Sequence, residues 1–211
     1  MGNINLITVV LGELQTNCYL LSNIQSNAAI IIDPAADFPI ICDMIIKNNL
    51  KPAAILLTHG HFDHMGAAAE LNGAYNIPIV ACADELALLA DPRMNGSQLM
   101  LGMDISVAAD QWVRDGDVIS PAGFDINVIA TPGHTGGGVC YYIEDEGTLF
   151  SGDTLFRGSY GRTDLPTGDA AMLARSIKDK LFALPGGAAV YPGHGRATDI
   201  GYEKQKNMIN F

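Results

Sequence analysis

The sequence is poor in basic residues. Only 12 Lys and Arg residues stand against 23 Asp and Glu, which gives a formal net charge of −11. Proteins that follow the phosphates of nucleic acids usually carry clustered Lys and Arg side chains, and this sequence has no such cluster. We therefore expect no nucleic-acid partner.

The sequence also has few cysteines and lacks long apolar runs. Its four cysteines are widely separated and form neither a Cys-x-x-Cys pair nor a short disulfide framework, which predicts reduced thiols and a reducing compartment. No apolar run approaches the roughly 20 residues of a membrane helix. The amino terminus has no cationic stretch of the kind that begins a secretory signal. We therefore expect a cytoplasmic protein without a membrane partner.

Short apolar strands and amphipathic helices alternate along the 211 residues, of which 48% are hydrophobic. We expect one globular domain, residues 1–211, because this length suffices for a single core. Two blocks of strands interleaved with helices predict two sheets packed face to face with helices outside, a four-layer α/β arrangement. The principal predicted strands are 4–11, 18–21, 28–32, 77–82, 126–130, 139–143, 148–150 and 188–191, and the principal helices are 37–49 and 170–184.

Two local features of these elements remain open to test. Asp37 is expected to cap the helix that it begins. The segment 91–116 shows no clean period and is expected to be a long loop or small subdomain beside the site. The methionines from Met94 to Met103 fit a gap-filling core better than a substrate wall.

All five histidines occur in motifs that directly follow a short apolar run. A further run, Leu149-Phe150-Ser151-Gly152-Asp153, repeats the pattern with a carboxylate. Buried strands would deliver these side chains to the carboxyl ends of a sheet, where open α/β folds place their ligands. The histidine motifs are Thr58-His59-Gly60-His61-Phe62-Asp63-His64, Thr131-Pro132-Gly133-His134 and Tyr191-Pro192-Gly193-His194-Gly195.

The spacing of these residues predicts two metal ions. His59 and His61 lie two apart on a turning backbone and can face one point, whereas Asp63 and His64 can face a second. Nitrogen and oxygen ligands without thiolates suit zinc, with iron or manganese as alternatives, and argue against a structural zinc finger. The expected ligands are His59, His61 and His134 for one ion, Asp63, His64 and His194 for the other, and Asp153 between them.

The chain resembles the metallo-β-lactamase fold family, and within it the glyoxalase II-like hydrolases. The resemblance implies an αββα sandwich and a binuclear site in which Asp153 bridges the two ions. Only 17 residues follow His194, so we expect the short, single-domain branch, without the carboxy-terminal domain that holds glutathione in full-length glyoxalase II. Besides the ligand motifs, the similarity lies in Leu14-Gln15-Thr16-Asn17-Cys18-Tyr19, Ile32-Asp33-Pro34 and Gly161-Arg162-Thr163-Asp164-Leu165-Pro166.

The ligand set indicates a hydrolytic reaction. Two divalent ions about 3.5–4 Å apart can share a water as hydroxide and polarise a carbonyl. Asp63, Asp153 and the hydroxide leave a surplus of about one positive charge, which would attract an anionic substrate. No histidine remains as a general acid, and this favours a thioester because a thiol with a pKa of about 8.5 leaves readily as thiolate. We expect cleavage of a small anionic 2-hydroxyacyl thioester, with Asp63 and Asp153 as catalytic carboxylates.

Three further residues are candidates for supporting roles. Asp33 is similar to the aspartate that orients the site in the family, although a simple turn former fits equally. Arg162 lies where longer relatives place a cationic substrate contact, although a loop salt bridge with Asp164 fits as well. Tyr160 is a candidate substrate contact that could supply a proton.

Two other activities remain open for such a chain. Persulfide dioxygenases, which use a single iron, are similar in the Gly161–Asp164 segment. The final motif, Tyr191–Gly195, resembles the hydrolase form instead. A lactone hydrolase would use the same chemistry and differ in the pocket, which segment 91–116 is expected to shape.

Overall fold

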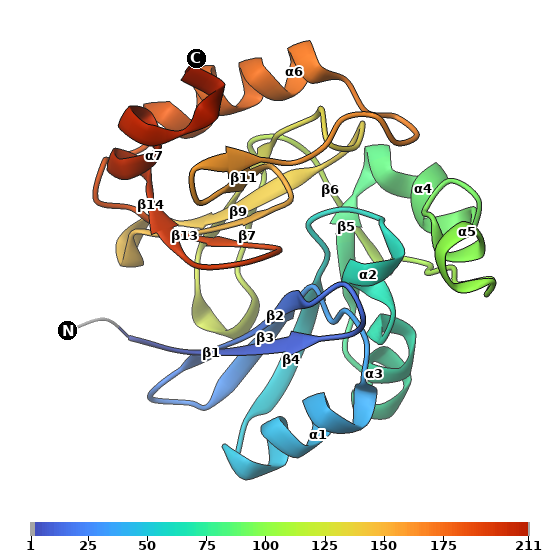
Figure 1. Cartoon of the computed structure of the whole chain (residues 1–211). Coiled ribbons are helices and arrows are strands. Elements are labelled where there is room, and N and C mark those ends of the chain that lie inside the picture. Colours follow the sequence, from blue (N-terminus) through green and yellow to red (C-terminus); the bar gives the residue numbers. More distant parts are fainter. Residues whose placement is uncertain (1–2, 211) are drawn as a thin grey trace.

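A computed structural model describes residues 3–210 and shows two sheets lying face to face between two layers of helices (Figure 1). The predicted αββα sandwich is therefore confirmed. In the first sheet the three amino-terminal strands pair antiparallel, whereas the last four pair parallel. In order across this sheet, the strands are β1 (Ile4–Leu11), β2 (Thr16–Asn23), β3 (Ala28–Ile32), β4 (Lys51–Leu56), β5 (Ile79–Cys82) and β6 (Gln111–Val113).

The second sheet is formed by the carboxy-terminal half of the chain. Its pairs are antiparallel except for one parallel pair, between its second and third strands. In order across the sheet, the strands are β14 (Thr198–Asp199), β13 (Ala189–Pro192), β10 (Thr148–Gly152), β9 (Val139–Ile143), β8 (Ile126–Ala130) and β7 (Val118–Ile119). A separate hairpin pairs β11 (Leu155–Phe156) with β12 (Ser159–Tyr160).

The helices cover the two outer faces of the sandwich. The principal ones are α1 (Phe38–Lys47) and α3 (Ala68–Tyr75) on the first sheet, and α6 (Ala170–Arg175) and α7 (Ile200–Lys206) on the second (Figure 1). The others are α2 (Phe62–Met65), α4 (Leu86–Ala90) and α5 (Ser97–Leu101), the π-helix η4 (Ser176–Lys180), and the 3-10 turns η1 (Ala83–Glu85), η2 (Pro121–Gly123), η3 (Glu144–Glu146), η5 (Leu181–Ala183) and η6 (Met208–Asn210).

The core has three layers, one between the sheets and one under each set of helices. The layer between the sheets contains Ile30, Leu56 and Phe150, and Tyr141 there donates its hydroxyl to the Leu57 carbonyl across the sheets (2.9 Å). Strands β8, β10 and β13 run in the same direction in the second sheet, and they end at the same edge of the sandwich as β4 of the first sheet. That edge carries the expected ligands.

The first helix shows one success and one error of the sequence interpretation. Ile41 and Ile45, four residues apart, are buried as the amphipathic pattern predicts. Asp37 is not a side-chain cap, because it has a left-handed backbone (φ 53°) and makes no capping hydrogen bond. Its carboxylate instead accepts the N–H of Gly12 (3.0 Å), so it ties the β1–β2 turn to the start of α1.

Segment 91–116 is more ordered than a loop. It contains helix α5 and strand β6, the latter pairing with β5 as the edge of the first sheet. The methionines do not fill a core, since Met100 and Met103 are each 59% exposed. The gap-filling interpretation of Met100 and Met103 was therefore wrong, whereas the segment does lie beside the site, because Met100 and Leu101 line a cavity with Asp63.

The predicted helix 170–184 has nearly the expected extent but changes type along its length. Asp169 caps it by accepting the N–H of Met172 (2.8 Å), and α6, η4 and η5 then follow without a break to Ala183. Across residues 3–210, none of the helices has the length and apolar character needed to cross a membrane.

Candidate metal centre

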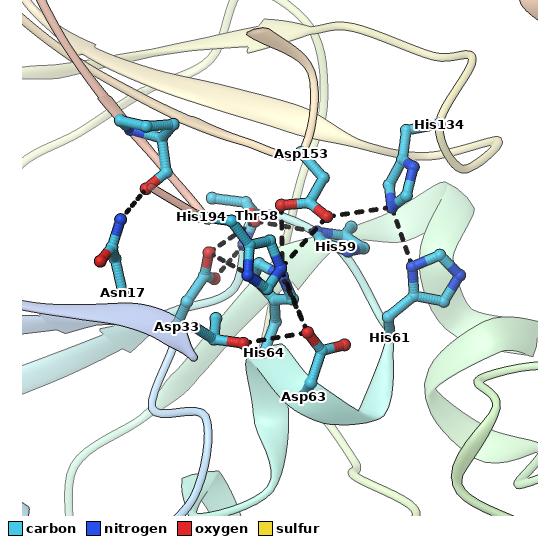
Figure 2. Close-up of polar contacts among 12 residues, drawn as sticks. Asn17, Asp33, Thr58, His59, His61, Asp63, His64, His134, Asp153 and His194 are labelled. Atoms are coloured by element: carbon cyan, nitrogen blue, oxygen red, sulfur yellow. Dashed lines mark hydrogen bonds and ion pairs between the residues drawn. The ribbon is translucent and has the colours of Figure 1, made fainter. Parts of the chain in front are cut away.

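The seven expected ligands converge at one edge of the sandwich, although they come from four separate turns (Figure 2). His59, His61, Asp63 and His64 follow β4 of the first sheet. The other three follow β8, β10 and β13 of the second sheet, and they are His134, Asp153 and His194. The site therefore forms only where the two sheets meet.

The ligand atoms fall into overlapping groups that could each hold an ion. We call His59, His61 and His134 the inner group, and Asp63, His64 and His194 the outer group; within each, the ligand atoms lie within 4.8 Å of one another. A third group of this kind joins His59 and His64 to Asp153.

Asp153 faces members of both groups. Its Oδ2 lies 3.6 Å from His134 Nε2 and 3.5 Å from His194 Nε2. Its Oδ1 lies 3.4 Å from His64 Nε2. This is the position that a bridging carboxylate requires.

The buried polar atoms of the centre fit divalent metal ions. Nε2 of His59, Nε2 of His64 and Oδ1 of Asp153 are all buried without a hydrogen-bond partner. Buried polar atoms in proteins are normally paired, so atoms left without a partner need an explanation. Nitrogen and oxygen donors that face one another around a common point are explained by bound cations.

Burial keeps the inner group neutral. The three imidazoles are only 3%, 6% and 5% exposed. Burial, reinforced by the neighbouring histidines, lowers the pKa of His61 to about 3 and that of His59 well below its ordinary value. Burial also lowers the pKa of His134. Neutral imidazoles have the free lone pair that a metal ion needs.

The outer group is charged instead. Burial alone would raise the pKa of Asp63, but His64 and His194 lower it to about 2. Burial alone would lower the pKa of His194, but contacts with Asp153 and Asp63 raise it to about 9. His194 is also the most accessible donor, with 28% of its side chain exposed.

Asp33 orients one ligand directly. Its Oδ2 lies 2.9 Å from Nδ1 of His64, which directs the opposite nitrogen of that ring toward the centre. The same carboxylate accepts the backbone N–H of Thr58 (2.8 Å) and the Thr58 hydroxyl (2.7 Å). Asp33 has a left-handed backbone (φ 49°), so it forms the turn after β3 as well.

Glu85 joins the two turns that carry the inner group, a role that the sequence interpretation missed. It is 1% exposed, and its carboxylate accepts the N–H of Gly60 and the N–H of Gly137, each at 2.7 Å. Gly60 lies between His59 and His61, and Gly137 lies three residues after His134. The only sequence signal was an acidic residue soon after an apolar strand, as at Asp153.

Residues of β2 hold the turn that carries His194, and they were missed as well. Asn17 donates its amide to the carbonyls of Pro192 (2.9 Å) and Gly195 (3.0 Å), and Tyr19 donates its hydroxyl to Pro192 (2.6 Å). Figure 2 shows the Asn17 contact beside the outer group. The available signal was the Leu14–Tyr19 motif, because Asn17 lies just before the predicted strand 18–21.

Thr16 and Gly193 complete the support of the outer group. The Thr16 hydroxyl donates to Asp63 Oδ2 (3.0 Å). A Cβ at Gly193 would stand 2.3 Å from Asp153 Oδ1 and 2.6 Å from His64 Cε1. The ligand turn can therefore approach the centre this closely only with glycine at 193.

The two candidate substrate residues lie on the hairpin side of the centre. The guanidinium of Arg162 makes two hydrogen bonds to Asp164, each at 2.7 Å, which is the loop salt bridge considered above. The Arg162 carbonyl instead contacts the centre, since it lies 2.7 Å from His134 Nδ1. Tyr160 is 38% exposed in β12. Contact of either side chain with a substrate stays a prediction.

Comparisons with known proteins agree with this geometry. The chain is 38% identical over 197 residues to a probable metallo-hydrolase, YqgX, of Bacillus subtilis, covering 93% of this chain and 92% of the relative. It is 34% identical over 207 residues to the hydroxyacylglutathione hydrolase GloC of Haemophilus influenzae, covering 97% of this chain and 96% of the relative.

Solved structures and a family model extend the comparison. The BLEG-1 B3 metallo-β-lactamase superposes with a TM-score of 0.92 at 40% identity, covering 97% of this chain and 98% of that one. The structure of TTHA1623 in a di-iron-bound form superposes with a TM-score of 0.85 at 35% identity, covering 96% of this chain and 98% of that one. The model of the metallo-beta-lactamase superfamily matches residues 11–194. The chain therefore belongs to the metallo-β-lactamase superfamily and is one of its metallo-hydrolases.

Proposed function

We propose that this metallo-hydrolase cleaves a 2-hydroxyacyl thioester with two zinc ions, one in each donor group. The observation that carries the proposal is that both groups are complete, with Asp153 facing each of them. The outer group would be the place of the second ion.

The residues of the chain hold and orient the centre. When bound, two divalent ions would supply an activated water and polarise the scissile carbonyl. Asp63 and Asp153 stay ionised beside the histidines and so offset the cationic charge. Thr16 fixes the Asp63 carboxylate, and Asp33 fixes the ring of His64. These contacts limit the rotation of the donors before a substrate arrives.

The leaving group favours a thioester over an amide. All five histidines of the sequence lie in the donor groups, so none is free to protonate a departing amine. A thiol with a pKa of about 8.5 departs as thiolate without that help. The hydroxyacylglutathione hydrolase among the relatives supports the same choice.

Hydrolysis of a β-lactam is the second candidate. The observation that favours it is the likeness to the BLEG-1 B3 metallo-β-lactamase over nearly the whole of both chains. A β-lactam ring is strained, so its nitrogen needs less protonation than that of an ordinary amide as it departs.

The test combines metal analysis with a substrate panel. Purified protein loaded with zinc or with iron is assayed with 2-hydroxyacyl thioesters, a lactone, a cephalosporin and a glutathione persulfide, while metal per chain is measured. We expect two ions per chain and the highest kcat/KM for a thioester. Persulfide-dependent oxygen uptake by protein with a single iron would contradict the proposal, and faster turnover of the cephalosporin would favour the second candidate.

A further inference from the structure

An apolar cavity lies beside the metal centre, on the side of Asp63. Its volume is about 360 Å³, within the roughly 300–1,000 Å³ typical of small-molecule sites. It is bounded by the β1–β2 turn, the segment after β3, the start of α2 and the segment from α5 to Ile105. The larger apolar side chains that line it are Leu11, Leu14, Phe62, Met100, Leu101 and Ile105.

The cavity offers no cationic side chain that would bind an anion. Among the described residues, no Lys, Arg or His lines it, and its charged lining residues are Glu13, Asp37 and Asp63. The hydroxyl of Thr16, which also lines it, is already donated to Asp63. Away from the metal centre, an anionic occupant would thus meet the Glu13 and Asp37 carboxylates and no cationic side chain.

The walls of the cavity expose more apolar surface than a core would. Leu14 is 43% exposed, Met100 59% and Leu101 37%. Exposed apolar side chains gathered around a hollow indicate a surface that a ligand covers. The size of the hollow suits a chain of several carbons rather than a protein segment.

We propose that this cavity binds the apolar acyl chain of the substrate, with the scissile carbonyl at its Asp63 end. The inference rests on the proposed thioester hydrolysis. It adds to that proposal that the acyl group has an uncharged chain and that helix α5 forms part of the cavity wall around this chain. Any anionic part of the thiol carrier then lies outside the cavity.

The reaction separates the acyl group of the substrate from its thiol carrier. Water forms the new C–O bond, and the electron pair of the broken C–S bond leaves with sulfur. The products are the carboxylate, the thiol and one proton. An anionic carrier that must leave into solvent does not fit beside the Glu13 and Asp37 carboxylates, whereas an uncharged acyl chain does.

The first measurement is a series of thioesters on one neutral carrier, N-acetylcysteamine, with acetyl, butanoyl and hexanoyl groups and a succinyl group as the anionic counterpart. We expect kcat/KM to rise about threefold to fourfold for each added methylene and succinyl to be the poorest substrate. Equal kcat/KM along the series would overturn the inference.

A pair of variants tests where the acyl chain of the substrate binds. Leu101→Lys places a cation in the wall, and we expect the preference for hexanoyl over acetyl to fall at least about tenfold while the succinyl thioester gains. Leu99→Lys is the matched control on the same helix, because Leu99 is 84% exposed and does not line the cavity. The same loss of preference in both variants would count against this wall.

Binding of an uncleavable ligand separates the inference from the proposed function. S-hexyl and S-ethyl thioethers of N-acetylcysteamine are titrated calorimetrically into the wild type and Leu101→Lys. We expect the hexyl ligand to bind at least about tenfold more tightly, with the difference lost in the variant. Tight binding of the hexyl ligand without thioester cleavage would support the acyl-chain cavity and contradict thioester hydrolysis. Thioester cleavage without any effect of chain length would support thioester hydrolysis and contradict the acyl-chain cavity.

Discussion

The inner and outer donor groups differ in how the fold prepares them for a metal ion. The inner group is buried and its imidazoles are neutral, so its lone pairs are free. The outer group holds an ionised Asp63 and a His194 whose pKa is raised to about 9, so a metal ion must displace a proton there. One protein thus combines a neutral, enclosed set of donors with a charged, accessible one.

The largest expected effect comes from removing the residue that joins the two groups. Asp153→Ala should lower kcat/KM by more than the roughly 10–100-fold that loss of a ligand's outer partner costs, and metal content should fall in both groups. Asp145→Ala, at an exposed turn position, is the control. Full activity and two ions per chain in Asp153→Ala would remove the basis of the binuclear site.

A pair of ligand variants tests the difference between the groups themselves. We expect His194→Ala to keep one ion and His61→Ala to keep one, each in the intact group. The metal content per chain is then measured after dialysis at pH values from 7.5 to 5.5. His61→Ala should lose its ion at a higher pH than His194→Ala, because protons compete with the metal ion for the outer group. Loss of both ions at the same pH would show that the two groups do not differ in this way.

Glu85 offers a way to weaken the inner group without touching a ligand. Glu85→Gln leaves one of two buried N–H groups facing an amide NH₂, which should cost about 1–3 kcal/mol of the free energy of unfolding and roughly 10–100-fold in metal affinity of the inner group. Urea unfolding and chelator competition measure the two effects. Glu70→Gln, an exposed carboxylate on α3, should change neither. An unchanged chelator profile in Glu85→Gln would argue against its positioning role.

The smallest expected effect is a pH dependence of the metal-free protein. The pKa of His194 in the folded protein, about 9, lies above the ordinary histidine pKa of 6.5. Its stabilising contribution is therefore fully present below about pH 6.5 and is lost as the pH rises through about 9. We expect the Tm of chelator-treated protein to fall over this range and the fall to be smaller in His194→Gln. A steeper fall in the variant would refute the assignment.

Much of the fold could be predicted because its strands are short apolar runs ended by turn residues. The bounds predicted for β3, β8 and β9 agree with the structure. Each ligand follows such a strand directly, so the sequence also indicated that the ligands gather at one edge. The structure brings the seven side chains together, although one close group, His59, His64 and Asp153, crosses the two predicted sets, so the assignment of ligands to ions stays a prediction.

The features that were missed depend on contacts between distant residues. Strand β6 has only three residues, which is too short to give a periodic pattern in the sequence, and it is defined by its pairing with β5. Glu85 binds an N–H 52 positions away, and Asn17 binds a carbonyl 175 positions away. A polar side chain that is satisfied by remote backbone cannot be distinguished locally from one that faces solvent.

The division of the donors between two sheets has a consequence for biosynthesis. Residues 4–113 build the first sheet and carry four donors, yet neither group is complete until His134 and His194 have been made and the second sheet has packed. If two ions bind as proposed, their capture is therefore a late event in maturation. A substitution far from the ligands that loosens the packing of one half on the other should first be seen as faster escape of metal, before secondary structure is lost.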